Sequence, residues 1–459
     1  MAVNFTKSAK EIMVFLVVIF VIIILVVTRY GTANKGYEVP DRPVKDDIIN
    51  QDNITGGLEN GPDINGDVPD DLVDGPDPSG TDEADRGTLE NVTFNAITAT
   101  ELAADIVIGW SLGNTLDAHG GLEGFPHLGG GIYANTTATE LELAWGRPLT
   151  VQEHFDVVRE AGFNAVRIPV TWYKACDADL NIREDWMERV KEITDFAVAN
   201  DLYIIINTHH DDILFRLLDE EIEESKQAMA KIWEQIAVAF EDYNEKLMFE
   251  SLGEPRTAGT AAEWRGGTAE EHNNLNILNQ IFVDTVRSTG GNNAERVLII
   301  PTYAASVNEA AQRGLVIPED PADDKIIVTV HFYEPWNFAL RSGEGSVQEW
   351  SADNRLDTDP ITRYIDLAYE IFVSKGIPVI IGEMGAINRD NLEARVAWAE
   401  FYTAYAKSKG MPCFWWDNGS YWVVRRRDWG WEQTFGLLDR ENFEIAHPEI
   451  VEALLRGAS

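Results

Sequence analysis

The sequence predicts an α/β protein that forms a closed (β/α)8 TIM barrel, and three observations lead to this fold class. Eight short apolar segments recur along residues 91–459. Most are near-continuous apolar runs, which is typical of parallel strands covered on both faces. Amphipathic segments separate them, and polar side chains follow nearly every run. A doubly wound sheet is the alternative, but it would not be expected to place polar side chains after nearly every strand.

The predicted strands share an apolar centre and a polar carboxyl end. In chain order they are Val107–Leu112, Ala165–Val170, Tyr203–Asn207, Lys246–Ser251, Arg296–Pro301, Ile326–Val330, Pro378–Gly382 and Pro412–Trp416.

Helical spacing marks the segments between these strands. One apolar stripe repeats at i, i+3, i+4, i+7 and i+11, and consists of Met229, Ile232, Trp233, Ile236 and Phe240. A second stripe consists of Val190, Ile193 and Ala197. Several helices are expected to stop at a glycine before the next strand, as at Gly162, Gly376 and Gly410.

An N-terminal segment, residues 1–30, precedes this pattern and contains a predicted membrane anchor. Ile12–Val27 is sixteen apolar residues without interruption. At about 1.5 Å per residue it is slightly short of a hydrocarbon core of ~30 Å, so the flanking Lys10 and Arg29 would have to snorkel. No small-residue cleavage site follows, which favours an uncleaved signal anchor over a signal peptide or a buried core helix.

Residues 31–90 form a predicted disordered acidic linker. From Glu38 to Glu90 there are 16 acidic and 3 basic residues, a net charge of −13, and almost no aromatic side chains. Such a segment cannot bury enough apolar area to offset its chain entropy. We therefore expect a tether between the anchor and the barrel domain, 91–459.

The acidic composition excludes some partners and predicts a dependence on salt. The net charge of the chain is −40, and a surface of this sign repels the phosphates of nucleic acids. Without the linker's −13 and the +3 of residues 1–37, −30 remains on residues 91–459. Because this self-repulsion destabilises a compact fold, we expect stability to require screening by salt. The two cysteines, Cys176 and Cys413, rule out a disulfide framework, and we expect free thiols.

Two carboxylates stand at the ends of two distant predicted strands. Glu254 follows the run in KLMFESLGEPR, and Pro255 biases the backbone there away from helix. Glu383 ends the strand in PVIIGEMGA, about 130 residues later. Because the carboxyl ends of barrel strands meet at one mouth, the pair is a candidate acid and nucleophile for glycosidic chemistry.

Other polar and aromatic residues follow the remaining strands, and together they predict a polar ring with aromatic walls. Each one alone has a structural explanation, such as an ion pair or core packing. They are Asn114, Arg167, His209, His210, Tyr303, His331, Tyr333, Trp416 and Asp417.

The motifs that carry these residues resemble those of glycoside hydrolase family 5, and most closely its bacterial endoglucanases. The resemblance covers nearly all of residues 91–459. The motifs are GWSLGNTLDA, AWGRPLT, GFNAVRIPVTW, NTHHD, ESLGEPR, HFYEPWNF, GEMGA and WWDNG, in this order.

This resemblance implies a TIM barrel that cleaves β-1,4-linked glucans with retention of configuration. It implies Glu254 as the general acid/base and Glu383 as the nucleophile, with Arg167 and Tyr333 in contact with Glu383. It also implies that His209 and His331 line the cleft and that Trp416 lies under the sugar at the cleaved bond. We expect Asn114 and His210 to contribute to substrate binding. Further sugar-stacking candidates are Trp145, Trp172, Trp336, Trp422, Trp429 and Trp431.

Two positions depart from the family pattern. Gly253 stands where the family usually has Asn, whose amide bonds the sugar 2-hydroxyl, and Ser111 replaces another Asn. By analogy with an oxyanion-hole donor, losing one such group costs on the order of 10²–10³ in rate. We therefore hypothesise a weakened catalyst unless water or a neighbouring side chain supplies the missing donor.

The leading functional hypothesis is a membrane-tethered, outward-facing endo-β-1,4-glucanase that is monomeric and needs neither cofactor nor metal. Its partners would be a β-1,4-glucan and, through the N-terminal helix, a membrane, with secretion if that helix is cleaved. The alternatives are a weakened surface glucan-binding protein and a hydrolase of xyloglucan, mixed-linkage glucan, xylan or mannan. Loops such as His119–Leu143 and Asp212–Gln227 would select among these substrates.

Overall fold

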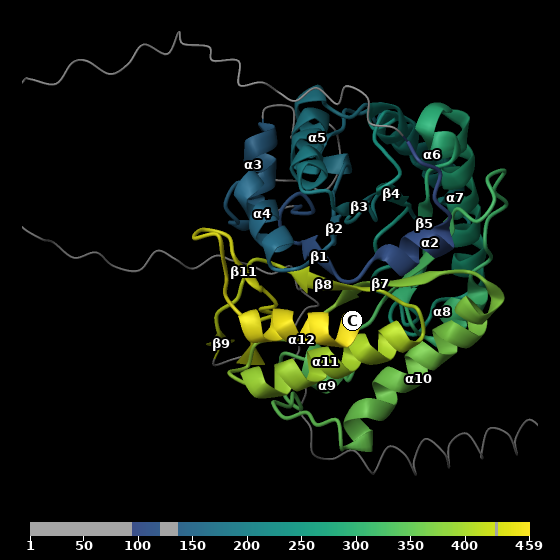
Figure 1. The fold of residues 1–459 in the computed structure, drawn as a ribbon. Helices are drawn as coiled ribbons and strands as arrows, with labels where there is room; N and C mark the ends of the chain where they lie inside the picture. Colours follow the sequence, from purple (N-terminus) through teal and green to yellow (C-terminus); the bar gives the residue numbers. More distant parts are fainter. Residues whose placement is uncertain (1–93, 120–135, 427–429) are drawn as a thin grey trace, which may run out of the picture. The chain divides into compact units, whose positions relative to one another are not determined.

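The computed structural model describes residues 94–119, 136–426 and 430–459, which belong to one compact unit, Asp85–Ser459. In this unit the strands β1 to β8 pair in sequence order, and β8 pairs with β1 to close a parallel barrel. Helices surround the barrel, as Figure 1 shows. The closed order confirms the predicted TIM barrel and excludes the doubly wound sheet, which is open.

Each of the eight predicted strands forms, with ends shifted by at most two residues except in β5, which extends five residues beyond its predicted end. They are β1 (Gly109–Leu112), β2 (Ala165–Ile168), β3 (Tyr203–Asn207), β4 (Leu247–Glu250), β5 (Leu298–Ser306), β6 (Ile326–His331), β7 (Val379–Met384) and β8 (Cys413–Asp417). Two short hairpins follow β8, formed by β9 (Arg425–Arg426) with β10 (Gly430–Trp431) and by β11 (Leu438–Asp439) with β12 (Glu444–Ile445).

The helices lie mainly between the strands. The longer ones are α2 (Ala99–Asp105), α4 (Gln152–Glu160), α5 (Glu184–Ala199), α6 (Ile222–Ala239), α7 (Ala269–Ser288), α10 (Arg355–Ile371), α11 (Leu392–Ser408) and α12 (Pro448–Ala458). The shorter ones are α3 (Ala138–Glu142), α8 (Glu309–Gly314) and α9 (Trp336–Ala339).

The predicted helical stripes face the core. On α6 the buried residues include Met229, Ile232, Trp233 and Ile236, and the stripe of α5 is buried as well. Glycine stops were predicted at Gly162 and Gly376, and these residues have φ of +106° and +85°. Residues with a side chain rarely adopt such values, so glycine allows the chain to turn there.

A second apolar cluster contains residues from seven of the eight strands together with α2. The α2 residues Ala99, Leu102 and Ala103 pack with strand residues such as Met248 and Phe414. At Gly109 on β1 a Cβ would lie only 2.0 Å from the Phe414 ring, so this ring requires glycine there. This cluster is fully apolar, and the polar side chains of the predicted site lie instead at the carboxyl ends of the strands.

Three register shifts occur in the barrel, and each lies near a strand's carboxyl end. They fall between Pro301 and Ser306 on β5, between Val330 and His331 on β6, and between Ile381 and Met384 on β7. Such irregularities re-aim side chains and are common beside functional sites. Here they set the directions of His331 and Glu383, which are register partners across β6 and β7.

The predicted anchor and the predicted acidic linker lie outside the described residues. In the part of the chain that the structure describes, every helix is too short or too polar to cross a membrane.

Candidate active site

Two carboxyl groups meet at the carboxyl end of the barrel. Glu254 lies on the loop after β4, and Glu383 lies within β7. One oxygen from each carboxyl and one nitrogen of His331 lie within 4.8 Å of one another. Two carboxyls about 5–5.5 Å apart suit a retaining glycosidase, whereas an inverting one needs about 6.5–9.5 Å to admit water. The spacing therefore fits a double displacement.

Glu383 receives two short hydrogen bonds, one to each oxygen. Arg167 donates from Nη1 to Oε1 at 2.8 Å, and the Tyr333 hydroxyl donates to Oε2 at 2.9 Å. Both donors stabilise the ionised form, and charge-assisted bonds of this kind are the strong ones. The contacts expected for Arg167 and Tyr333 are therefore present.

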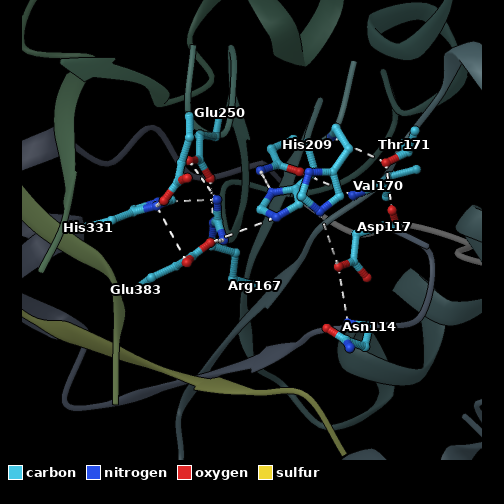
Figure 2. Close-up of polar contacts among 12 residues, drawn as sticks. Asn114, Asp117, Arg167, Val170, Thr171, His209, Glu250, His331 and Glu383 are labelled. Atoms are coloured by element: carbon cyan, nitrogen blue, oxygen red, sulfur yellow. Dashed lines mark hydrogen bonds and ion pairs between the residues drawn. The ribbon is translucent and has the colours of Figure 1, made fainter. Parts of the chain in front are cut away.

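Arg167 is itself held by a second carboxylate, which the sequence analysis did not identify. Glu250, the last residue of β4, accepts from Arg167 Nε at 2.6 Å and from Nη2 at 3.0 Å, and both side chains are fully buried. In Figure 2 the guanidinium lies between Glu250 and Glu383. A charged residue inside an apolar strand was the available signal, because a buried charge requires a partner.

His331 connects the two carboxyl groups. Its Nδ1 lies 2.8 Å from Glu254 Oε1 and 3.5 Å from Glu383 Oε2, and its Nε2 lies 3.5 Å from Arg167 Nη2. Arginine can only donate, so His331 Nε2 accepts. His331 Nδ1 therefore carries the ring proton and donates a hydrogen bond to Glu254. Burial lowers the pKa of His331 to about 4, so the ring is neutral near pH 7.

The two carboxyls differ in their environments. Burial raises the pKa of Glu383 above its usual value, and His331, Arg167 and the hydrogen bond from Tyr333 oppose that rise. Burial also raises the pKa of Glu254, which only Arg256 and Arg167 oppose. The Glu254 side chain is 27% exposed against 7% for Glu383, so the group facing solvent is the one with fewer donors. Glu254 therefore suits proton transfer and Glu383 suits attack.

His209 lies beside Glu383 with its orientation fixed. Its Nε2 is 3.9 Å from Glu383 Oε1, and its ring stacks on Trp416 with centroids 5.6 Å apart and planes 16° apart. The Asn207 oxygen accepts from the Val170 amide at 3.1 Å, so the Asn207 NH₂ faces His209 Nδ1 at 3.2 Å. His209 Nδ1 therefore accepts, and Nε2 carries the proton. Burial lowers the pKa of His209 well below its usual value, so the ring is a neutral donor.

Gly253 lies against His209. A Cβ at residue 253 would be 2.8 Å from His209 Nδ1 and 3.2 Å from the His209 carbonyl oxygen. The φ of Gly253 is not positive, so the backbone itself would tolerate a side chain. Space rather than conformation restricts this position. The imidazole of His209 occupies the room that a larger residue would need.

The remaining predicted binding residues lie farther from the carboxyl pair. His210 Nε2 is 3.9 Å from Asp117 Oδ2, and Asp117 accepts from the backbone amide of Asn114 at 3.1 Å. In Figure 2, Asp117 and Asn114 lie apart from Glu383, with His209 between Glu383 and Asp117. His210 also lies against Trp145, with ring centroids 5.7 Å apart. These residues extend the polar surface along the barrel mouth.

Two predicted members of the polar ring have structural roles. Tyr303 is 1% exposed and donates to Glu271 at 2.9 Å. Asp417 is fully buried and accepts from Trp110 Nε1 at 2.9 Å and from Arg440 at 3.2 Å. The prediction that Tyr303 and Asp417 line the site is wrong, because each side chain is buried and hydrogen bonds to partners within the core.

The tryptophan candidates also divide. Trp172 is fully buried and donates to the Asn207 carbonyl at 2.8 Å, so it belongs to the core and its assignment to sugar stacking is wrong. Trp336 and Trp422 are each 48% exposed and present aromatic surface. Trp145 and Trp431 are partly exposed. Trp429 lies outside the described residues.

Two groups of side chains bring potential metal ligands together. Glu254, His331 and Glu383 form one, and Asp117, His209 and His210 form the other, with ligand atoms within 4.8 Å in each group. A hydrogen bond already joins His331 to Glu254 in the first. Hydrolysis by a carboxyl pair requires no metal. Cys176 and Cys413 are both buried free thiols, as predicted.

Comparison with known proteins gives a consistent result. A family model described as cellulase (glycosyl hydrolase family 5) matches residues 129–421. The chain is 41% identical over 363 residues to Endoglucanase B of Neocallimastix patriciarum, covering 79% of this chain and 72% of that protein.

Two similar solved structures contain bound oligosaccharides. One is a GH5-4 broad specificity endoglucanase from Ruminococcus champanellensis with bound cellotriose (38% identity, TM-score 0.72, 79% of this chain and 99% of that chain). The other is a mutant glycoside hydrolase 5 lichenase from a Caldicellulosiruptor species in complex with cellotetraose (37% identity, TM-score 0.72, 80% and 97%).

Proposed function

The chain belongs to the cellulase family of glycosyl hydrolases, family 5, and from this premise we propose that it is a retaining endo-β-1,4-glucanase acting on cellulose-type glucans. The observation that carries the proposal is the Glu254–Glu383 pair, with oxygens within 4.8 Å of each other and two donors on Glu383. A protein that only binds glucan has no need of both carboxyls in this arrangement. The glucan-binding alternative is therefore set aside.

The first step uses both groups at once. Glu254 gives its proton to the departing glycosidic oxygen while Glu383 attacks the anomeric carbon, which forms a glycosyl ester and releases the leaving chain. Arg167 hydrogen bonds to both Glu250 and Glu383, so its single positive charge is shared. The shared charge of Arg167 keeps Glu383 ionised. Because Glu250 also pairs with this cation, Glu383 is stabilised less than in an exclusive ion pair and stays reactive as a nucleophile.

The second step reverses the roles. Glu254, now a carboxylate, takes a proton from water, and the water attacks the anomeric carbon and frees Glu383. The proton on His331 Nδ1 points to Glu254 Oε1 and stabilises this anionic form. Two inversions give overall retention.

Azide separates the two roles in variants. With Glu254→Ala, the glycosyl ester forms from an aryl β-cellobioside because the activated leaving group needs no acid, and azide then yields a β-glycosyl azide. With Glu383→Ala, azide enters in place of the carboxylate and yields the α-azide by direct displacement. Reversal of these products would exchange the assignments, and unchanged reducing-sugar release from glucan by both variants would end the proposal.

We also propose activity on mixed-linkage β-glucan, because the similar structures include a lichenase and a broad specificity endoglucanase. The catalytic side chains contact only the sugars at the cleaved bond, so linkage preference depends on loops further along the barrel mouth. Product analysis on cellulose derivatives, mixed-linkage glucan, xyloglucan, xylan and mannan tests this breadth. Exclusive cleavage of xylan or mannan would contradict it.

For the location, we propose a cell-surface enzyme tethered by residues 1–30 and the acidic linker, 31–90, or secreted if the first segment is cleaved. The support is the sixteen-residue apolar run Ile12–Val27 and the charge of the linker. Expression of the full chain, followed by alkaline extraction of membranes, tests the anchor. A chain of full length found wholly in the soluble fraction would contradict it.

A further inference from the structure

Two buried arginines in the barrel wall lack the carboxylate partners that three other buried arginines have. Among the described residues, Arg167, Arg287 and Arg440 each form ion pairs, with Glu250, Asp320 and Asp417 as partners. Arg389 and Arg395 are fully buried and form no ion pair within the described part of the chain. The sequence has 77 Asp and Glu residues, so acidic side chains are not scarce.

Arg395, near the start of α11, has an unsatisfied guanidinium fork. Its Nε donates to the Ala386 carbonyl at 3.1 Å, while Nη1 and Nη2 are buried and have no partner in the described structure. One face of the group lies 6.0 Å from the Trp415 ring. Arg296 provides a contrast: it is equally buried and has no carboxylate, but its three nitrogens all donate to protein acceptors. A lack of carboxylates alone therefore does not leave an arginine unsatisfied.

Arg389 supplies a second unsatisfied donor on the neighbouring loop. Its Nη2 donates to the Arg341 carbonyl at 2.7 Å and its Nη1 donates to the Phe338 carbonyl, but its buried Nε has no partner. The buried Thr434 hydroxyl is also without a partner, and the Thr434 carbonyl accepts from the amide of the residue before Arg389, Asn388, at 2.9 Å. Arg389 and Thr434 thus each contribute an unpaired donor, on two segments that this backbone hydrogen bond joins.

The two buried charges of Arg389 and Arg395 are both positive. Burial and, to a smaller extent, the charge of Arg389 together lower the pKa of Arg395 to about 9. Burial lowers the pKa of Arg389 to about 10. Among the described residues, no carboxylate contributes to either shift. A buried cation with free N–H groups and a second cation nearby is costly, because each unpaired donor loses its water without gaining an acceptor.

We infer that Arg395, together with Arg389, holds a small monovalent anion of the chloride class in the barrel wall, between the loop after β7 and α11. A monovalent anion accepts from both unpaired nitrogens of the fork and balances one of the two positive charges, whereas a water molecule could accept the same hydrogen bonds but would add no charge. Full burial favours a monatomic ion over a phosphate or sulfate, whose greater size and charge make them harder to accommodate and desolvate. The site is separate from the carboxyl pair and does not depend on the proposed function.

Chloride-dependent melting of the full-length protein tests the site. Chloride replaces glutamate stepwise from 0 to 0.2 M at a constant sodium concentration, so the ionic strength and general screening stay fixed. A ligand that binds only the folded state stabilises it with the logarithm of its concentration. For a domain of this size we expect Tm to rise by about 2 °C for each tenfold by which the chloride concentration exceeds its Kd. An equal Tm in chloride and glutamate would overturn the inference and leave water as the partner.

Two variants make the test specific to this site. Arg395→Met removes the fork and keeps the apolar stem, so its Tm should no longer respond to chloride. Arg456→Met removes the same charge from an exposed arginine paired with Glu400, and it should keep the wild-type response. A chloride response in Arg395→Met equal to that of the wild type would overturn the assignment. If Arg395→Met does not fold, the wild-type titration still decides.

Discussion

Replacing Gly253 by Asn restores the residue usual in the family, yet the structure predicts a loss of activity. A Cβ at this position would approach His209 Nδ1 to 2.8 Å and the His209 Cα to 3.3 Å. Contacts under about 3.0 Å force a movement. The backbone there is fixed by the barrel, so the imidazole has to move.

The cost follows from what the imidazole gives up. Moving it breaks the 3.2 Å hydrogen bond from Asn207, worth about 1 kcal/mol, and the stacking on Trp416, worth about 0.5–1.5 kcal/mol. Their loss, about 1.5–2.5 kcal/mol, corresponds to a roughly ten- to sixtyfold fall in kcat/KM if the ring acts in the transition state. The amide can offset this only if it reaches the sugar 2-hydroxyl.

The assay is kcat/KM on an aryl β-cellobioside, with Gly253→Ala as the matched control. Alanine adds the same Cβ without the amide, so the ratio of the two variants isolates the amide from the crowding. We expect kcat/KM of both variants to fall at least tenfold, and because the lost contacts also stabilise the folded enzyme, we expect both melting temperatures to fall by about 2–3 °C. A Gly253→Asn enzyme faster than the wild type, or a Gly253→Ala enzyme equal to it, would refute the reasoning.

Three further predictions concern charge and chemistry. Arg256 lowers the pKa of Glu254, so Arg256→Gln should raise that pKa. Because Glu254 must be protonated at the start of the reaction, the alkaline limb of the pH profile of kcat/KM should move to higher pH. A shift of this limb to lower pH would contradict the reasoning. Glu250→Gln leaves Arg167 buried with half its carboxylate partners, so denaturant unfolding should show a loss of about 3 kcal/mol, against less than 1 kcal/mol for Glu400→Gln at the surface. Burial raises the pKa of both cysteine thiols, so native protein should resist alkylation at neutral pH and its Tm should not change with reductant; rapid labelling of either thiol would argue against the packing.

The fold was predictable because its signals are local. Parallel strands covered on both faces are apolar throughout, and each of the eight runs was long enough to stand out. The predicted ends of the strands were less accurate where the backbone is irregular. The strand predicted as Arg296–Pro301 extends to Ser306 through Ala304 and Ala305, whose φ values of +52° and +46° interrupt the usual pattern.

The site was predictable only in part, because its groups pair over long distances in the sequence. Glu250 and Arg167 are separated by 83 residues, and no local spacing connects them. Trp172 follows β2 and Trp416 lies near the end of β8, but only Trp172 turns inward to donate to the Asn207 carbonyl. A strand end identifies which residues are near the barrel mouth. It does not identify which of them face the core.

The position of Gly253 shows why the effect of a departure from a family pattern cannot be judged from the missing side chain alone. From the sequence, the missing amide implies a handicapped catalyst. In the structure, the same glycine admits an imidazole whose Nε2 proton lies beside the nucleophile, with a tautomer set by Asn207. The lost donor and the admitted donor occupy neighbouring space, so the two effects oppose each other. Their sum depends on the space beside Gly253, where an added Cβ would lie only 2.8 Å from His209 Nδ1. That separation depends on the packing of two strand ends, which no motif specifies.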